Sequence, residues 1–410
     1  MQIEIVSIGS ELLTGRIVNT NAAFLCARLE CEGYRVCLQT TLPDERVPLL
    51  RGLKEALARS DLVIATGGLG PTLDDETREV AAELFQSGFR IDEEIKEELR
   101  ERYPGRFFAV EDQARIPTKA TPLKNKVGSA PGLLFSEGGK TLILLPGVPK
   151  EMEPLFLEAA FPYIQKRFPV PAKHRVPLHF CLVFESLLDP HLRKLSSLYP
   201  AVEVGIYPAH GTVSVILTSL QEKQLRAFEG DLLLRFGEYR YEATSIAEAL
   251  QVACIAQGKT LACAESCTGG RVASCVTAIA GSSAYFLGSL VTYSNGMKHS
   301  LLGVSEATLA SQGAVSAEVV QEMLLGVFRC TEADYAIAVS GIAGPSGGAP
   351  DKPLGTVFAA LGERGKVPDV GSFKVLGNRE TRIFTSSQYL LGALWRKIVK
   401  GIPAFPLLNI

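Results

Sequence analysis

Hydrophobic and polar positions in the first part of the chain follow two alternating patterns. Short apolar runs that end near glycine or proline predict strands, and apolar residues at intervals of three and four predict helices. The strand runs are residues 2–9, 34–40, 61–66 and 141–145, and the helical segments are 20–32, 46–59 and 76–85. Strands that alternate with helices of about ten to fifteen residues are typical of βαβ units. We therefore predict an α/β domain with a parallel, doubly wound sheet.

The pattern changes further along the chain. Residues 100–140 are irregular and rich in Pro, Gly and Lys, so we expect an excursion that carries site loops and not core. A Pro-containing stretch at 168–171 indicates a linker. Strand, helix and hairpin patterns then predict a small α+β unit, and a second doubly wound α/β domain begins near residue 250. The expected division is 1–172, 173–249 and 250–410.

Length and composition agree with several globular domains. The chain has 410 residues, whereas a single core rarely exceeds roughly 250–300. Hydrophobic residues make up 47% and charged residues 21%, which excludes a disordered chain. The 42 Lys and Arg against 44 Asp and Glu give a net charge of −2. No overall basic field therefore attracts nucleic acid or a membrane surface, and we expect neither as a partner.

The nine cysteines are scattered, without a CxxC pair and without His at ligand spacing. This distribution excludes a zinc ribbon or a disulfide framework and indicates a reduced, cytoplasmic setting. No basic region precedes the first apolar run, so we expect no signal peptide. No apolar run reaches the about 18 residues that span a bilayer.

A glycine-rich segment, residues 65–75, is the sharpest chemical feature of the first part. It joins a predicted buried strand to a helix, where glycines allow close approach of a ligand and backbone N–H groups favour an anion. Asp74 and Asp75 follow the glycines and suit a divalent cation that bridges phosphate oxygens. The alternative is that these aspartates only cap the helix. Three glycines and Thr72 directly upstream favour a site.

Ser266 occupies a second strand-to-helix turn, in the last part of the chain. Its hydroxyl is expected at the carboxyl end of a strand and near a helix N-terminus, which suits a nucleophile, although serine is also a favoured N-cap. A nucleophilic serine needs a base, and the five histidines fall mostly in the middle unit. A desolvated lysine can serve instead. Lys298 and Tyr293 follow an apolar strand. By itself, Lys298 is better interpreted as a solvated surface lysine, and Tyr293 could alternatively be core packing.

Four stretches of the first part, in chain order, carry a resemblance to a known family: GSELLTGRIVNTNAAFL, TGGLGPTLDDET, KNKVGSAPG and LPGVPKEM. They resemble the signature of CinA-family proteins, whose first domain is similar to the molybdopterin-binding fold. The resemblance implies hydrolysis of ADP-ribose to AMP and ribose 5-phosphate with a divalent metal (Mg, Mn or Co). The implied ligand residues are Gly67, Gly68, Gly70, Thr72, Ser10, Glu11, Asn21 and Asn125, and the implied metal ligands are Asp74 and Asp75.

Four later stretches, AESCTGG, GSSAYFLGSLVTYSNGMK, GAVS and SGIAGPSGG, resemble the CinA C-terminal domain, the nicotinamide-nucleotide amidohydrolase family. That resemblance implies conversion of nicotinamide mononucleotide to nicotinic acid mononucleotide and ammonia, without a metal or other cofactor. Ser266 would be the nucleophile, Lys298 the general base and Tyr293 a site residue. The remaining implied residues are Thr268, Gly269 and Gly270 around the nucleophile, Ser340 beside the reacting amide, and Gly341 to Gly348, including Gly344, around the phosphate.

One position departs from this family pattern. Family members commonly carry an arginine four residues after the arginine of a Gly-Asp-Arg-like motif. Here the motif reads Gly377-Asn378-Arg379, and the later position is Ile383, with Arg382 one place early. We therefore expect the phosphate contact mainly from Arg379.

The middle segment resembles the KH-like module of full-length CinA proteins. It lacks the GXXG loop with which a KH module grips nucleic acid, and its acidic and basic residues nearly balance. A structural linker or homodimerisation role is the better prediction. One rival reading of the whole chain stays open, namely a non-catalytic adaptor that binds a molybdopterin-like ligand or a competence-linked partner.

Overall fold

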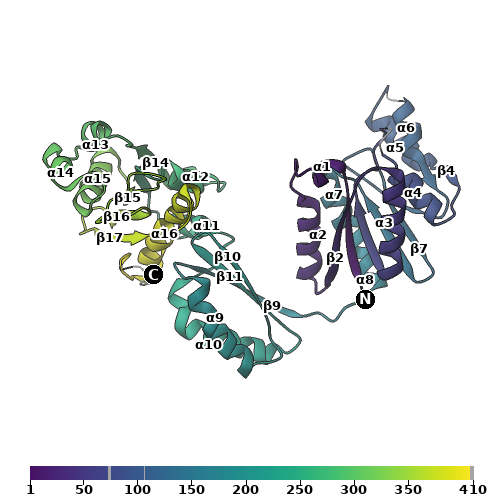
Figure 1. Ribbon diagram of the computed structural model, residues 1–410, viewed down its shortest axis with the longest axis horizontal. Coiled ribbons are helices and arrows are strands. Elements are labelled where there is room, and N and C mark those ends of the chain that lie inside the picture. The colour runs from purple at the N-terminus through teal and green to yellow at the C-terminus, as the bar shows by residue number, and fades with distance from the viewer. Residues whose placement is uncertain (73–74, 106, 407–410) are drawn as a thin grey trace. The chain divides into compact units, whose positions relative to one another are not determined.

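The computed structural model describes residues 1–72, 75–105 and 107–406, with the side chains of 107–109 left aside. These residues form two compact units, Met1–Lys173 and His174–Ile410 (Figure 1). Each unit has its own sheets and its own hydrophobic core, so each is described by itself.

The first unit is built on a six-stranded sheet in the order β2-β1-β3-β8-β7-β6. The strands are β1 (Ile3–Ile8), β2 (Val36–Leu42), β3 (Leu62–Thr66), β6 (Thr121–Leu123), β7 (Gly132–Glu137) and β8 (Lys140–Leu145). The first four in spatial order run parallel, and β7 and β6 extend the sheet in antiparallel fashion. The carboxyl ends of β1, β2, β3 and β8 therefore lie together at one edge of the sheet.

Helices cover both faces of this sheet, because alternate strand residues point to opposite sides. Ile3 and Ile5 pack under α2 and α7, whereas Val6 and Ile8 pack under α3 and α4. The helices are α1 (Ser10–Leu13), α2 (Thr20–Cys31), α3 (Arg46–Arg59), α4 (Thr77–Leu84), α5 (Glu93–Arg102), α6 (Phe107–Ala114), α7 (Pro149–Leu155) and α8 (Phe161–Arg167), with a π-helical turn at Phe156–Ala160 and a small ribbon of β4 (Phe89–Ile91) and β5 (Arg115–Pro117). The doubly wound α/β prediction is confirmed, with a mixed sheet in place of a parallel one.

The predicted irregular excursion over 100–140 is wrong in part. Strand β7 lies inside this range and pairs with β8 along its length. Leu133 and Phe135 are fully buried in the core. Proline and glycine upstream of the strand hid its short apolar run from a reading by local pattern.

The second unit begins with a four-stranded antiparallel sheet in the order β10-β11-β9-β12. Its elements are β9 (His174–Cys181), α9 (Glu185–Leu198), β10 (Glu203–Ala209), β11 (Thr212–Ser219), α10 (Glu222–Phe236) and β12 (Arg240–Tyr241). Inward-facing Val213, Val215 and Leu217 alternate with more exposed neighbours along β11 and pack in one cluster with Leu192 of α9 and Phe228 of α10. The predicted hairpin and helices are present.

A five-stranded sheet, β14-β13-β15-β16-β17, forms the rest of the second unit. The strands are β13 (Leu261–Glu265), β14 (Phe286–Val291), β15 (Tyr335–Gly341), β16 (Thr356–Glu363) and β17 (Asp369–Lys374), and the helices are α11 (Ile246–Ala256), α12 (Arg271–Thr277), α13 (Asn295–Leu302), α14 (Glu306–Gln312), α15 (Ala317–Cys330) and α16 (Arg379–Lys400). β13, β14 and β15 are parallel, and β16 and β17 are antiparallel. Helices α11 and α16 pack on one face, and α13 and α15 on the other.

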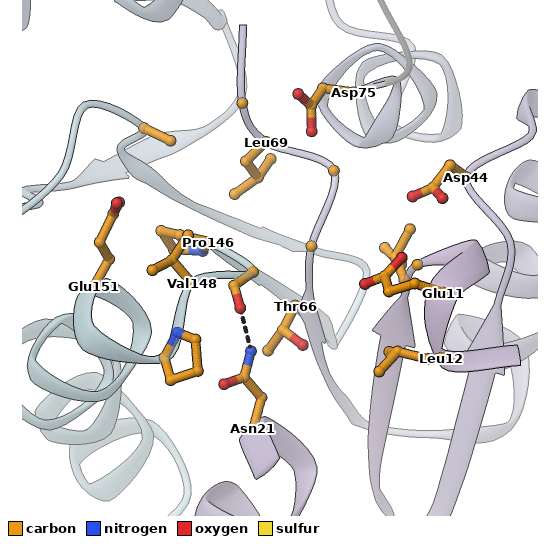
Figure 2. A pocket seen from close by; sticks show the side chains of 18 of the residues that line it. Glu11, Leu12, Asn21, Asp44, Thr66, Leu69, Asp75, Pro146, Val148 and Glu151 are labelled. Atoms are coloured by element: carbon orange, nitrogen blue, oxygen red, sulfur yellow. Dashed lines mark hydrogen bonds between the residues drawn. The ribbon is translucent and has the colours of Figure 1, made fainter. Parts of the chain in front are cut away.

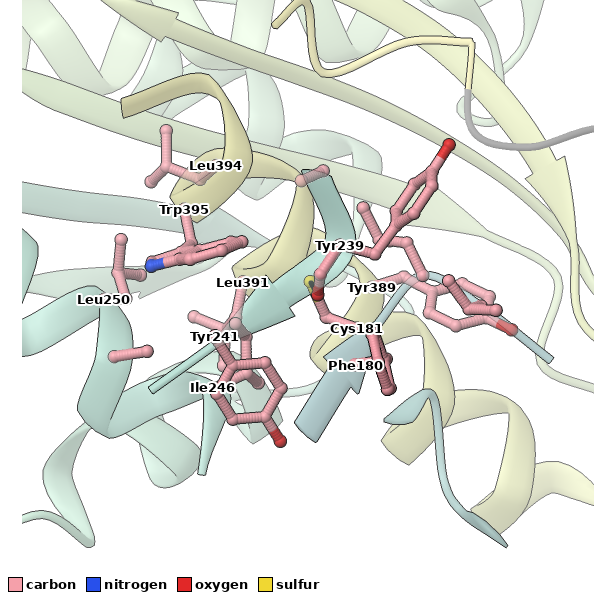
Figure 3. Close-up of a cluster of buried hydrophobic side chains, with 14 of the residues drawn as sticks. Phe180, Cys181, Tyr239, Tyr241, Ile246, Leu250, Tyr389, Leu391, Leu394 and Trp395 are labelled. Atoms are coloured by element: carbon pink, nitrogen blue, oxygen red, sulfur yellow. Dashed lines mark hydrogen bonds between the residues drawn. The ribbon is translucent and has the colours of Figure 1, made fainter. Parts of the chain in front are cut away.

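One hydrophobic core joins the two sheets of the second unit. Phe180 and Cys181 of β9 and Tyr241 of β12 lie among residues of α11 and α16 (Figure 3). The Tyr241 ring meets Trp395 of α16 edge-on, with ring centroids 6.2 Å apart. The separation of 173–249 from 250–410, and the KH-like character of the former, stay predictions. In the described ranges, no helix is long and apolar enough to cross a membrane.

Candidate functional sites

The first candidate site forms where β3 ends and the chain turns toward α4. Gly67 and Gly68 have φ of 110° and 64°, which L side chains rarely adopt. A Cβ on Gly67 would lie 2.2 Å from the Ile8 carbonyl oxygen, and one on Gly68 would lie 2.1 Å from Thr77 Oγ1. Only glycine fits at either position, so the loop passes close to the sheet edge and leaves an open space above it.

That space is a pocket of ≈ 620 Å³ at the carboxyl ends of the parallel strands (Figure 2). Six of the predicted residues line it: Gly67, Gly68, Gly70, Glu11, Asn21 and Asp75. Asn21 is fixed by its amide, which donates to the Gly147 carbonyl over 2.7 Å. Its Oδ1 is buried and has no hydrogen-bond partner among the described residues. An acceptor oxygen thus remains available beside the pocket.

Other predicted residues lie outside the lining. Thr72 donates its N–H and its hydroxyl to Asp75 Oδ2 and so holds that carboxylate. Asn125 donates to the Ala130 carbonyl and to Glu151 Oε2, at 2.8 and 3.0 Å, and so positions a loop and a carboxylate that do line the pocket. Asp74 lies outside the described residues. The Ser10 N–H donates to Asp44 over 2.8 Å.

Asp44 and Glu151 are two further pocket residues that were not predicted from the sequence. Asp44 follows the carboxyl end of β2, which reaches the same sheet edge, and Glu151 lies within the LPGVPKEM stretch. These positions in the sequence could have indicated that both residues lie near the pocket. With Glu11 and Asp75 they make four carboxylates in the pocket (Figure 2). Of the described residues that line it, none is Lys, Arg or His.

The pocket carboxylates suit a divalent cation that is held partly by the protein and partly by substrate phosphates. Within the described residues, no three His, Cys, Asp or Glu side chains converge as a closed metal cage. Magnesium commonly uses one or two carboxylates together with substrate phosphates. Asp75, fixed by Thr72, and Glu11 could hold a cation that arrives with phosphate oxygens.

The second candidate site lies at the carboxyl end of β13. Lys298, on α13, is 1% exposed, and its Nζ lies 2.9 Å from Ser266 Oγ. The same Nζ lies 2.9 Å from the Thr292 carbonyl oxygen and 3.2 Å from that of Tyr293. Ser294 caps α13 and fixes the helix that carries the lysine. The alternative of a solvated surface lysine is therefore wrong.

These three contacts suit a neutral amine. The two carbonyl oxygens can only accept, so they take the two N–H bonds of a neutral Lys298. The lone pair then faces the hydroxyl of Ser266, which can donate. Burial lowers the pKa of Lys298 and so favours the form that accepts a proton.

Ser266 does not cap α12. The N-cap position of that helix is Gly270, and the buried carboxylate of Glu265 accepts from the N–H groups of Gly270, Val272 and Ala273 at 2.9–3.0 Å. Ser289 donates to the same carboxylate. Glu265 was not predictable from the sequence, because only the folded turn brings its carboxylate to the start of the helix. The hydroxyl of Ser266 is left for Lys298.

Groups that could bind an oxyanion surround Ser266. In the described part of the chain, no backbone carbonyl accepts from the N–H groups of Cys267 and Thr268, and Thr268 Oγ1 is buried without a partner. Gly269 and Gly270, with φ of 59° and 94°, shape this turn. Burial raises the pKa of the Cys267 thiol to about 12, so it is no competing nucleophile at neutral pH.

Arg379 connects the remaining predicted residues. Its guanidinium donates to the Gly344 carbonyl over 2.7 Å and to the Tyr293 hydroxyl over 3.0 Å. Tyr293 is 58% exposed, so the alternative of a core residue is wrong. Arg382 donates to the Ala343 carbonyl. Both arginines therefore reach the loop after β15.

Ser340 and Gly341 end β15 beside the nucleophile turn. The Ser340 hydroxyl donates to the Ala314 carbonyl over 2.7 Å and keeps only its acceptor capacity for a ligand. A Cβ on Gly341 would lie 3.1 Å from Cys267 Sγ and closer still to the Thr356 carbonyl. Glycine there lets the loop run directly past the turn that carries Ser266.

Two family models match separate parts of the chain. Residues 4–166 match the model of the probable molybdopterin binding domain, and residues 243–397 match that of the CinA C-terminal domain. A CinA-like protein of Thermotoga maritima is 38% identical over 407 residues, covering 97% of this chain and 98% of the relative. The chain belongs to the CinA family.

Other CinA relatives cover the chain as broadly or in part. A CinA-like protein of Endomicrobium trichonymphae is 37% identical over 97% of this chain and 99% of its own length. A putative competence-damage inducible protein of Symbiobacterium thermophilum is 40% identical over 88% of this chain and 89% of its own. The crystal structure of a protein CinA from Thermoplasma acidophilum is 39% identical, covers 40% of this chain and 96% of its own, and has a TM-score of 0.37.

Proposed function

We propose that the second site is a serine–lysine amidohydrolase that converts nicotinamide mononucleotide to nicotinic acid mononucleotide and ammonia. One observation carries the proposal: a fully buried Lys298 amine lies 2.9 Å from the hydroxyl of Ser266, and two carbonyl oxygens are placed to accept both hydrogens of the neutral amine. A nucleophile with its base in hydrogen-bond reach is the arrangement that acyl transfer needs.

The chain's own groups supply each step. Ser266 Oγ attacks the carboxamide carbon while Lys298 takes the hydroxyl proton, and the carbonyl oxygen becomes an oxyanion held by N–H groups of the turn. The C–N bond then breaks, and Lys298 gives its proton to the departing amide nitrogen, which leaves as ammonia. Water attacks the resulting acyl-serine while Lys298 takes its proton. The bond between the acyl carbon and Ser266 Oγ then breaks, Lys298 returns the proton to Oγ, and the carboxylic acid departs.

The substrate class rests on the CinA resemblance and on Arg379. A guanidinium beside backbone N–H groups of the Gly341–Gly348 loop suits the phosphate of a mononucleotide. Tyr293, half-exposed and bonded to Arg379, would lie along the substrate's body.

The test is ammonia release from nicotinamide mononucleotide by the full chain, with and without chelator. We expect release that chelator leaves unchanged and that Lys298→Met abolishes, since this variant keeps the length of the side chain but removes the base. Ser266→Ala should abolish release and retain nucleotide binding. Undiminished release by either variant would refute the serine–lysine mechanism.

For the first site we propose metal-dependent hydrolysis of ADP-ribose to AMP and ribose 5-phosphate. Four carboxylates and no cationic side chain among the described lining residues would repel a bare pyrophosphate, so the substrate would bind with a divalent cation. The cation, when bound, would neutralise the phosphates and polarise the P–O bond that breaks. Asp75 and Glu11 would hold it, and Asn21 would accept from a substrate hydroxyl.

AMP release from ADP-ribose tests this second activity. We expect release in Mg²⁺, Mn²⁺ or Co²⁺ that chelator stops, and a strong loss in Asp75→Asn, with Asp61→Asn, outside the pocket, as the matched control. Equal loss in both variants, or release that chelator leaves intact, would refute the assignment. If neither ammonia nor AMP is released, the alternative of a non-catalytic adaptor protein would be favoured.

A further inference from the structure

Glu151 lies across the first pocket from the other three carboxylates. The parallel strands are ordered β2-β1-β3-β8, and Asp44 follows β2, Glu11 follows β1, and Glu151 follows β8 at the start of α7. Neighbouring strands are about 4.8 Å apart, so the ends of β1 and β8 are separated by about 10 Å. Figure 2 shows Glu151 set apart from the other three carboxylates. The pocket volume of ≈ 620 Å³ leaves room for a pyrophosphate and a water molecule between them.

The Glu151 carboxylate is held by the loop that precedes β7. Asn125 Nδ2 donates to Glu151 Oε2 over 3.0 Å. A Cβ on Gly128 would lie 1.6 Å from the same oxygen, so a larger residue there would displace the carboxylate. Asn125 Oδ1 accepts from the N–H groups of Val127 and Gly128. Arg102 donates to the carbonyls of Asn125 and Gly128. The loop is thus closed by its own bonds and does not need Glu151 to close it.

The second oxygen of this carboxylate is available to a ligand. In the described ranges, the amide of Asn125 is the donor that the Glu151 carboxylate meets, and no Lys, Arg or His pairs with it. Glu151 lies in the first turn of α7, but its carboxylate accepts from no backbone N–H group of that helix among the described residues. Oε1 is therefore free to accept a proton from a water molecule in the pocket.

We propose that Glu151 is the general base that activates the hydrolytic water in the first pocket. This role rests on the proposed hydrolysis of ADP-ribose. The water oxygen forms a bond to one phosphorus of the pyrophosphate while Glu151 Oε1 takes one of its protons. The bond from that phosphorus to the bridging oxygen breaks, the bridging oxygen keeps the electron pair, and AMP and ribose 5-phosphate leave. Glu151 then gives its proton to solvent.

AMP release by the full chain in Mn²⁺ tests the role of the carboxylate. Glu151→Gln keeps the side-chain shape and an acceptor for Asn125 but removes the base. We expect kcat to fall about 100-fold or more with KM little changed, because the other contacts to substrate and cation remain. Glu153→Gln, on the same helix but outside the pocket lining, is the matched control and should keep the rate.

Cation binding and stability separate a base from a metal ligand or a structural residue. Mn²⁺ is titrated into the full chain in the presence of AMP and followed by electron paramagnetic resonance. Glu151→Gln should bind Mn²⁺ as the wild-type chain does, whereas Asp75→Asn should bind it about tenfold or more weakly. The unfolding temperature of Glu151→Gln without ligand should equal that of the wild-type chain, because the loop keeps its own bonds.

The outcomes distinguish this proposal from the proposed function on which it rests. Undiminished kcat in Glu151→Gln, while the wild-type chain releases AMP, would overturn the base role alone. A loss of Mn²⁺ affinity as large as that in Asp75→Asn would make Glu151 a metal ligand, and a clear drop in unfolding temperature would make it structural; either would overturn the proposal. If the wild-type chain releases no AMP with Mg²⁺, Mn²⁺ or Co²⁺, the function proposed for the first site fails and the base role fails with it.

Discussion

Lys298 has all of its polar hydrogens directed at protein acceptors, and this sets the pH behaviour expected of the second site. Catalysis needs the neutral amine, and burial lowers the pKa of that amine. The rate constant kcat/KM should therefore rise with pH along a limb whose midpoint lies below the about 10.4 of a free lysine. Ammonia release measured from pH 6 to 10 checks this. A limb at or above the free-lysine value would contradict the role of burial.

The neighbouring residues Ser266 and Cys267 offer a direct comparison of two possible nucleophiles. Because burial holds the pKa of Cys267 at about 12, its thiol stays protonated at neutral pH. We expect Cys267→Ala to retain most ammonia release and Ser266→Ala to lose it. Iodoacetamide at neutral pH should leave the rate nearly unchanged, and inactivation traced to Cys267 would contradict this prediction.

Sequence reasoning reached these residues unevenly. Ser266 and the glycines that follow it are one local segment, so the turn was predictable from pattern. Lys298 is 32 positions away, and only the parallel pairing of β13 with β14 brings it to the same sheet edge. Burial is a tertiary property, so the choice between a base and a surface lysine could not come from residue type alone.

At the scale of elements, Glu265 fixes the start of α12 through three hydrogen bonds from backbone N–H groups, and its carboxylate accepts a fourth from Ser289 of β14. Replacing Glu265 by Gln removes the charge and turns one acceptor into a donor that faces N–H groups. We expect a loss of about 2–3 kcal/mol in unfolding free energy, measured by urea denaturation. Glu306→Gln, on an exposed helix, is the matched control and should change the stability little.

The start of α16 should control substrate affinity more than turnover. Arg379 is exposed at the loop after β15, and we expect Arg379→Ala to raise KM about 10- to 100-fold with a smaller change in kcat. Steady-state kinetics with nicotinamide mononucleotide checks this. The KM of Arg382→Ala shows whether Arg382 contacts the substrate phosphate in place of the arginine that family members commonly carry at the position of Ile383. An unchanged KM in Arg379→Ala would remove it from the phosphate site.

Element prediction worked where the chain alternates regularly and failed where the partner was distant. β1, α2 and β3 were predictable because their apolar spacing is local. β7 was missed, since a six-residue strand is stabilised by pairing with β8 and not by its own pattern. Asp44 and Glu151 were missed for the same reason: they reach the first pocket from separate connections, after β2 and at the start of α7.

For the whole molecule, the two units have separate cores, whereas the two sheets of the second unit share one. A fragment of residues 174–410 should therefore fold and keep its ammonia release. A fragment of 243–410 leaves Tyr389 and Trp395 without the β9 and β12 residues that cover them, and it should unfold at a lower temperature. Thermal denaturation of both fragments tests this, and equal midpoints would show that the shared core adds nothing.

The shared core also sets the order in which the chain can fold during synthesis. Residues 1–173 contain every strand of their sheet, so the first unit can close as soon as it leaves the ribosome. The second unit cannot: Phe180 and Cys181 emerge early, but the residues that cover them lie on α16, at the other end of the unit. The four-stranded sheet of the second unit therefore keeps part of its apolar surface uncovered until α16 has been translated and can pack against it.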